Sequence, residues 1–219
     1  MVIVMKAKVN EIFISLQGES TWMGRPTVFV RFAGCNLNCP WCDTQYAKKE
    51  FKEMDIESVV EEIKEYNCRY ICFTGGEPLL QYEELINISE HFPGYHISVE
   101  TNGSIEILQR PNIQKFVMDI KCPSSMVNKD YYRVALKNVE NLNHEDEVKF
   151  VVATQSDLSF IGELLDGLPK EIVKLISPAW PGTLTLPDLA VQIVDWRTHN
   201  VLLQIQQHKI IWGTDKRGV

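Results

Sequence analysis

In Cys35-Asn36-Leu37-Asn38-Cys39-Pro40-Trp41-Cys42, three thiols lie within eight residues. Soft sulfur ligands favour iron–sulfur clusters and zinc over hard cations. A zinc site usually takes a fourth Cys or His at short spacing, and the nearest histidine, His91, is far downstream. The Asn and Pro residues favour a loop over three ordinary buried cysteines. We therefore interpret the thiols as ligands of a 4Fe-4S cluster with one open iron, with zinc as the alternative.

Further motifs extend this interpretation to a family. The cysteine spacing, with an aromatic residue before the last thiol, and the stretch Thr74-Gly75-Gly76-Glu77-Pro78 resemble the radical S-adenosylmethionine (SAM) superfamily. Three segments resemble, more narrowly, the 7-carboxy-7-deazaguanine synthase family: Ser15-Leu16-Gln17-Gly18-Glu19, Cys42-Asp43-Thr44 and the tail at residues 211–219. The resemblance covers essentially the whole chain in motif order and length.

The resemblance implies an enzyme with three cofactors: a 4Fe-4S cluster, S-adenosyl-L-methionine and Mg²⁺. Its reaction would convert 6-carboxy-5,6,7,8-tetrahydropterin to 7-carboxy-7-deazaguanine with release of ammonia, in queuosine and deazapurine biosynthesis. The cofactors would carry the radical chemistry, so we assign no catalytic acid or base. An electron donor such as flavodoxin or ferredoxin is also expected, and so is a homodimer.

The same resemblance places candidate residues on this sequence. The cluster ligands are Cys35, Cys39 and Cys42, and Thr44 is expected to bind Mg²⁺. The residues expected to bind SAM are Gly76, Glu77, Glu100, Asn102, Asp119, Ile120, Lys121, Ser177, Pro178, Ala179 and Trp180. The residues expected to bind the pterin are Leu16, Gln17, Gly18, Glu19, Arg31, Thr74 and the C-terminal Val219.

Elementary chemistry supports several of these assignments. An Arg fork binds a carboxylate bidentately, which suits Arg31 to the carboxyl group of the pterin, and a structural ion pair is the alternative. The carboxylate of Glu19 and the amide of Gln17 suit an aminopyrimidinone edge. Gly75 and Gly76 lack side chains, so we expect their backbone to approach the ligand closely. For Glu100 and Asn102 we expect contacts with ribose hydroxyls, with a plain turn as the alternative.

Composition limits the protein class. The chain has 219 residues, a formal net charge of −7 and 45% hydrophobic residues, which fits a soluble globular protein of one domain, residues 1–219. It carries no basic field for nucleic acid and no apolar run long enough to span a membrane, and we expect no signal peptide. Six cysteines are too sparse for a disulfide scaffold, and we expect a cytoplasmic protein.

Short β-rich runs alternate with amphipathic helical runs through the middle of the chain. This alternation predicts an α/β fold with a partial, open TIM-type barrel of about six mostly parallel strands, the cysteine loop following the first core strand. We expect strands at residues 28–32, 70–74, 96–100, 116–121, 147–152 and 172–177, with 201–205 closing the sheet. We expect helices at residues 56–66, 82–91, 156–165 and 185–198, starting from caps such as Asp55, Ser156 and Thr185.

Two rival functions share some of these features. An activating enzyme that makes a glycyl radical on a protein partner would use the same cluster, but it needs an open face for a polypeptide. A non-catalytic zinc-binding module would use only the thiols. Cys68, Cys72 and Cys122 lack tight spacing, and we expect them to be small buried side chains.

Overall fold

One nine-stranded sheet runs through the protein, with the strand order β3-β1-β2-β4-β5-β6-β7-β8-β9. The computed structural model describes residues 5–108, 110–180, 182–198, 200–214 and 216–219. The strands are β1 (Lys6–Leu16), β2 (Pro26–Phe32), β3 (Lys52–Asp55), β4 (Tyr70–Gly75), β5 (His96–Thr101), β6 (Lys115–Asp119), β7 (Glu147–Val152), β8 (Val173–Pro178) and β9 (Val201–Leu203). The α-helices are α1 (Ile56–Glu65), α2 (Tyr82–Glu90), α3 (Lys129–Val139), α4 (Gln155–Leu165), α5 (Leu186–Trp196) and α6 (Gln207–Trp212).

The sheet is open and mostly parallel, as predicted. All neighbouring strands from β2 to β9 pair in parallel, whereas β1 pairs antiparallel with both β2 and β3. The strands β3 and β9 are the two edges, so the barrel does not close. The barrel was expected to have about six strands, and the sheet has nine. The seven predicted segments all contain strands, and β1 and β3, which the sequence did not reveal, add two. Among the described residues, no helix is long and apolar enough to cross a lipid bilayer.

The helix starts follow from their first residues. Asp55 occupies the N-cap position of α1, as predicted, although its side chain makes no capping hydrogen bond. The predicted cap Ser156 is wrong, because Thr154 and Asp157 form a reciprocal capping box that starts α4 earlier. Thr185 caps α5 with Asp188 as its partner, as expected from Thr185 and the following Pro187. The helices α3 and α6 were not predicted.

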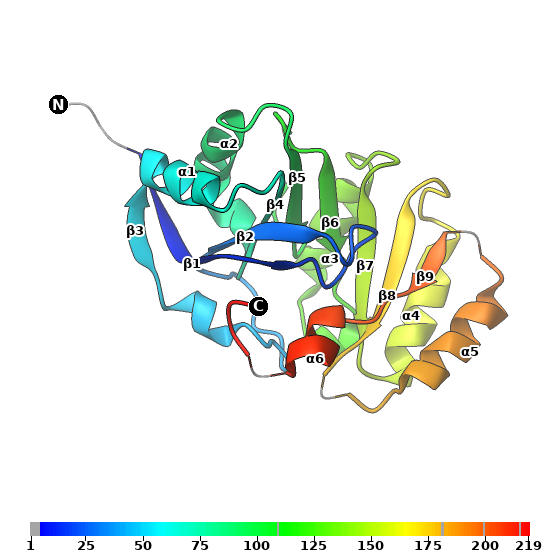
Figure 1. Ribbon diagram of the computed structural model, residues 1–219. Helices are drawn as coiled ribbons and strands as arrows, with labels where there is room; N and C mark the ends of the chain where they lie inside the picture. The colour runs from blue at the N-terminus through cyan, green and yellow to red at the C-terminus, as the bar shows by residue number, and fades with distance from the viewer. Residues whose placement is uncertain (1–4, 109, 181, 199, 215) are drawn as a thin grey trace.

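The two faces of the sheet differ in polarity. Alternate residues of the parallel strands, such as Val30, Phe73, Val99 and Phe150, are buried in the hydrophobic core. Figure 1 shows helices packed against this outer side of the sheet. The residues between them face the inside of the open barrel, where the strand register aligns neighbouring polar side chains. Because a strand alternates its faces with period two, one apolar and one polar series produce this inner polar face.

The glycine pair after β4 packs against the backbone of the cysteine loop. A Cβ on Gly75 would lie 2.2 Å from the carbonyl oxygen of Phe32, and a Cβ on Gly76 would lie 2.2 Å from that of Gly34. Gly75 also has a φ of +148°, which side chains rarely adopt. The missing side chains therefore let the end of β4 touch the start of the cysteine loop, and the close approach of this backbone to a ligand stays a prediction.

Candidate active site

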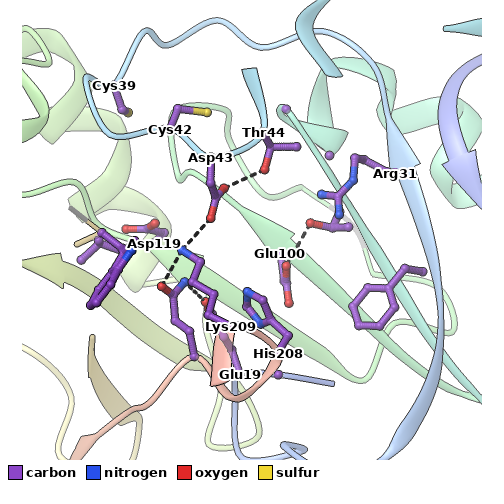
Figure 2. A pocket seen from close by; sticks show the side chains of 18 of the residues that line it. Glu19, Arg31, Cys39, Cys42, Asp43, Thr44, Glu100, Asp119, His208 and Lys209 are labelled. Carbon is purple, nitrogen blue, oxygen red and sulfur yellow. Dashed lines mark hydrogen bonds and ion pairs between the residues drawn. The ribbon is translucent and has the colours of Figure 1, made fainter. Parts of the chain in front are cut away.

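A cavity of about 850 Å³ opens at the carboxyl ends of the strands, where active sites of barrel-type α/β folds gather. Strand ends, the cysteine loop, the β1–β2 loop and the C-terminal tail all contribute to its wall (Figure 2). The structure brings most of the predicted residues together here. The predicted residues in the wall are Leu16, Gln17, Gly18, Glu19, Arg31, Cys35, Cys39, Cys42, Thr44, Thr74, Gly76, Glu100, Asn102, Asp119, Lys121, Ala179, Trp180 and Val219.

A few predicted residues lie behind the wall: Glu77, Ile120, Ser177 and Pro178. Glu77 is fully buried, and its carboxylate accepts hydrogen bonds from the backbone N–H groups of Leu79 and Asn102 and from the hydroxyl of Thr101. Burial raises the pKa of Glu77. Its side chain therefore joins β4 to β5 and does not line the cavity, and a contact of Glu77 with SAM stays a prediction.

The three cysteine thiols are free and line the same cavity. Burial raises the pKa of the Cys39 thiol. Among the described residues, no three His, Cys, Asp or Glu side chains are grouped tightly enough to bind a single metal ion. The thiolates of an iron–sulfur cubane each bind a different iron, so they are spread more widely than the ligands of one zinc ion. The three thiols in one cavity wall stay the predicted ligands of such a cluster.

An unsatisfied carboxylate oxygen marks the strand ends next to the cysteine loop. Oδ2 of Asp119 accepts from Lys121 at 2.7 Å, but buried Oδ1 has no partner among the described residues. Buried acceptors are normally satisfied, so Oδ1 calls for a donor from a bound molecule or a water. Nearby, Nδ2 of Asn102 lies 3.8 Å from Sγ of Cys35, so this predicted SAM-binding residue adjoins the cluster loop.

Glu100 lies between the two sets of predicted contacts. One carboxylate oxygen accepts from Nε2 of Gln17 at 3.2 Å, and the other accepts from the hydroxyl of Thr74 at 2.9 Å. Gln17 is 2% exposed, and its Oε1 accepts from the backbone N–H of Glu19 at 3.2 Å. The amide of Gln17 thus uses its oxygen and one of its two N–H donors within the protein, and its predicted contact with the pterin stays a prediction.

Helix α6 packs on the β1–β2 loop and fixes Glu19. A Cβ on Gly18 would lie 2.1 Å from Nδ1 of His208, so only glycine permits this approach. The carboxylate of Glu19 accepts from Nζ of Lys149 at 2.5 Å and from Nε2 of Gln206. Burial alone would raise the pKa of Glu19, but the charge and hydrogen bond of Lys149 lower it overall. Glu19 is therefore an ionised carboxylate at neutral pH.

The same helix reaches the residues that follow the last cysteine. Lys209 donates to Gln206 at 2.8 Å and forms an ion pair with Asp43 at 2.8 Å. Figure 2 shows Lys209 between Asp43 and Glu19. Burial opposes ionisation of Asp43, but Lys209 and the hydroxyl of Thr44 lower its pKa to about 2. A single polar chain thus links the cluster loop to the β1–β2 loop.

Arg31 is fixed by a hydrogen bond from one nitrogen of its guanidinium group, and its side chain lines the cavity. Its Nε donates to Oε1 of Glu11 at 2.7 Å, and Tyr46 donates to the same oxygen at 2.9 Å. The described residues offer no hydrogen-bond acceptor to its terminal nitrogens, and the side chain lines the cavity. The ion pair with Glu11 therefore fixes a side chain that lines the cavity, and the binding of a carboxylate by its terminal nitrogens stays a prediction.

The C-terminal tail lies along the cysteine-loop side of the cavity (Figure 1). The guanidinium of Arg217 stacks 3.6 Å from the ring centre of Tyr46 and donates to Glu50 at 3.0 Å. Val219 reaches the cavity wall, in the place predicted for it. Asp215, part of the tail motif, lies outside the described residues.

Comparison with known proteins places this site in a family. A model of the radical SAM superfamily matches residues 29–152. The 7-carboxy-7-deazaguanine synthase of Clostridium acetobutylicum is 38% identical over 226 residues, covering 98% of this chain and 100% of the relative. This chain belongs to the 7-carboxy-7-deazaguanine synthase family of radical SAM enzymes. The family member from Methanospirillum hungatei is 37% identical and is covered over 85% of its length.

The fold comparison agrees with the sequence comparison. The crystal structure of QueE from Escherichia coli matches with a TM-score of 0.70 over 91% of this chain and 94% of that chain, at 24% identity. Membership of the 7-carboxy-7-deazaguanine synthase family confirms the predicted radical SAM enzyme and a role in deazapurine biosynthesis. It implies a 4Fe-4S cluster and SAM. It also decides against the zinc-binding module.

Several residues of this family member's site escaped prediction. Lys149, His208, Lys209, Asp43 and Tyr46 all line the cavity without having been assigned a role. Lys149 was the most accessible to prediction, because it is a charged residue between the apolar residues Val148 and Phe150 of a strand. The others depend on how α6 and the cysteine loop fold back over the sheet, which local sequence does not reveal.

Proposed function

We propose that this chain converts 6-carboxy-5,6,7,8-tetrahydropterin to 7-carboxy-7-deazaguanine with release of ammonia. The observation that carries the proposal is one cavity that contains three thiols, the free fork of Arg31 and the ionised Glu19. In Figure 2, Arg31 and Glu19 lie at different ends of the labelled group with Glu100 between them. A substrate with a carboxylate at one end and an aminopyrimidinone at the other suits this charge pattern.

In this proposal, Cys35, Cys39 and Cys42 hold the cluster, and the unsatisfied oxygen of Asp119 accepts a hydrogen bond from SAM. When bound, the cluster and SAM supply the radical that abstracts hydrogen from the substrate. The protein binds and orients the pterin: Arg31 clamps its carboxylate, and Glu19 accepts from its ring nitrogens. The hydroxyl of Thr74, fixed on Glu100, borders the reacting ring. The tail around Val219 excludes water from one side.

Thr44 and Asp43 are the residues that we propose to hold Mg²⁺. Both supply hard oxygen atoms, which Mg²⁺ prefers, and both lie in the cavity wall. The hydroxyl of Thr44 lies 2.8 Å from Oδ1 of Asp43, so one ion or one of its waters can touch both. Bound there, Mg²⁺ would supply positive charge beside the carboxylate of the substrate.

The proposal extends to partners and setting. An electron donor such as flavodoxin or ferredoxin would reduce the cluster, and free thiols suit the cytoplasm. We also propose a homodimer, which the exposed apolar side chains of Val191, Val194 and Ile210 support.

The test is an anaerobic turnover assay. The reconstituted protein is incubated with 6-carboxytetrahydropterin, SAM, Mg²⁺ and dithionite, and products are identified by mass spectrometry. We expect 7-carboxy-7-deazaguanine to form with the wild type and not with the matched Cys39→Ala variant. Cleavage of SAM without any deazapurine product would refute the proposed substrate, and cleavage stimulated by a polypeptide would instead support an activating enzyme.

A further inference from the structure

Lys149 is a buried charge in the cavity wall whose presence the proposed reaction does not by itself require. It projects from β7 toward the inside of the barrel, and its side chain is 13% exposed. Its one hydrogen-bond partner among the described residues is Glu19, which is 10% exposed. A buried ion pair stabilises a fold little compared with apolar side chains of similar size. Its place in a binding cavity therefore indicates recognition of a ligand.

The site needs a hydrogen-bond donor beside Glu19. An aminopyrimidinone presents a carbonyl oxygen next to a ring N–H, so it requires a donor and an acceptor side by side. Gln17, whose amide was expected to meet this edge, uses its oxygen and one of its two N–H donors within the protein. The ammonium of Lys149 has three N–H donors, and the bond to Glu19 uses one of them.

The carboxylate of Glu19 is also held in one orientation by hydrogen bonds to both of its oxygens. One oxygen of Glu19 is held by Lys149, and the other accepts from Nε2 of Gln206, the N-cap residue of α6. Gln206 is in turn held by Lys209 at 2.8 Å. The acceptor and the donor therefore face the cavity in a fixed relative position before any ligand arrives, which favours one hydrogen-bonding pattern over its reverse.

We propose that Lys149 and Glu19 together select the lactam of the substrate. The ammonium of Lys149 donates to the carbonyl oxygen, and the carboxylate of Glu19 accepts from the adjoining ring N–H. Lys149 is thus a specificity-determining residue for 2-amino-4-oxo heterocycles. This inference rests on the proposed function, because it assumes that a pterin occupies the cavity.

The pattern discriminates against a 4-amino heterocycle. An amino group in place of the carbonyl oxygen would point a donor at the Lys149 ammonium, leaving both groups unpaired. A lost charge-assisted hydrogen bond corresponds to roughly 10- to 100-fold in affinity. Without Lys149, the freed Glu19 carboxylate can accept from the diamino ring, so the preference for the 4-oxo form should collapse or reverse.

The experiment measures two dissociation constants. The probes are the unreactive oxidised ligands 6-carboxypterin and its 4-amino counterpart, bound to the anaerobically reconstituted enzyme loaded with SAM. We expect the wild type to bind 6-carboxypterin roughly 10- to 100-fold more tightly than the 4-amino ligand. Lys149→Met should reduce that ratio to about one or invert it, and Lys149→Arg, which keeps the donors, should retain part of it.

Lys115→Met is the matched control. It breaks a similar buried ion pair, Lys115 with Glu147 (8% and 1% exposed), away from the cavity wall, so it should keep the wild-type ratio. If Lys149→Met does not fold, Glu19→Gln/Lys149→Met removes both charges and should also lose the preference. Equal binding of the two ligands by the wild type, or an unchanged ratio in the Lys149 variants, would overturn the inference while the proposed function stands. Failure of the wild type to bind either ligand would overturn both.

Discussion

Replacing Gly76 by alanine tests whether the glycine pair supports the cysteine loop. The new Cβ would lie 2.2 Å from the carbonyl oxygen of Gly34 and 2.9 Å from Cβ of Cys35, where ordinary contacts begin at 3.4 Å. The loop would therefore have to move by about 1 Å. Two backbone hydrogen bonds cross the contact: Gly76 to Phe32 at 3.2 Å and Glu77 to Gly34 at 2.8 Å.

The expected loss of stability is large. Overpacking costs about 1–3 kcal/mol, and each lost backbone hydrogen bond adds about 1 kcal/mol, so we expect a loss of about 3–5 kcal/mol. The free energy of unfolding of a domain is only about 5–15 kcal/mol, so the variant apo-protein should unfold at a clearly lower urea concentration than the wild type. Its iron content after anaerobic reconstitution should also fall.

Gly94→Ala is the control for this prediction. Gly94 has a φ of +78°, but nothing lies within 4 Å of its Cβ position, so the cost is limited to backbone strain of about 1–2 kcal/mol. Its iron content should equal that of the wild type. If Gly76→Ala were as stable as Gly94→Ala and bound iron fully, the close packing against the cysteine loop would have no functional meaning.

Three further predictions concern the cavity. Arg31→Ala should weaken binding of the carboxylated pterin by about 100-fold, because a bidentate ion pair is lost, whereas uncoupled SAM cleavage should change little. Equal losses in the binding assay and the cleavage assay would argue against carboxylate recognition by Arg31. Lys209→Met should lower the free energy of unfolding by only about 1 kcal/mol, because Asp43 is 47% exposed and solvent screens its ion pair with Lys209. Lys209→Arg keeps the charge, so an equal loss in that variant would argue that the ion pair contributes nothing to stability. Burial lowers the pKa of His208 below its ordinary 6.5. As the pH falls, the imidazole is therefore protonated in the unfolded chain before it is protonated in the folded protein. The contribution of the neutral imidazole to the free energy of unfolding is present above about pH 6.5 and is lost below it. Urea unfolding of the wild type and His208→Gln between pH 7.5 and 5.5 should therefore show the steeper loss in the wild type, and parallel curves would contradict the burial of the imidazole.

The strand-rich middle of the chain was predictable because local pattern and tertiary role agree there. Runs such as Tyr70–Gly75 are short, apolar and followed by turn residues, and they form buried strands. Helix α1 was predictable from the helical spacing of Val59, Val60 and Ile63, all of which are buried. The antiparallel strand β1 was missed because most of its residues are only partly buried and a bulge at Val9 and Glu11 breaks its register.

Two other features depend on contacts that local sequence does not encode. Strand β3, with the sequence KEMD, is polar and forms by pairing with the edge of β1. Helix α6 has no buried residue, and it is held by Gly18 and Glu19 from the other end of the chain. Propensity alone therefore gave no reason to expect it.

The residues of the site also divide into those that local sequence predicts and those that depend on distant contacts. The thiols and Glu19 are in recognisable motifs and Arg31 is on the strand before the cysteine loop, so each could be assigned to the site from sequence. How Glu19 reaches the cavity depends on the antiparallel pairing of β1 with β2, which the sequence did not reveal. Lys149 was missed because alternation in a strand is usually read as one buried and one solvated face. In this open barrel, the polar face of β7 instead lines the cavity, which makes Lys149 part of the site.

The most direct test of the central claim is Mössbauer spectroscopy of the protein reconstituted anaerobically with ⁵⁷Fe. If three thiols hold a 4Fe-4S cluster with an open iron, about four irons per chain should be found, and adding SAM should shift the signal of one of them. A spectrum that SAM leaves unchanged, or a protein that takes up zinc and no iron, would contradict the account.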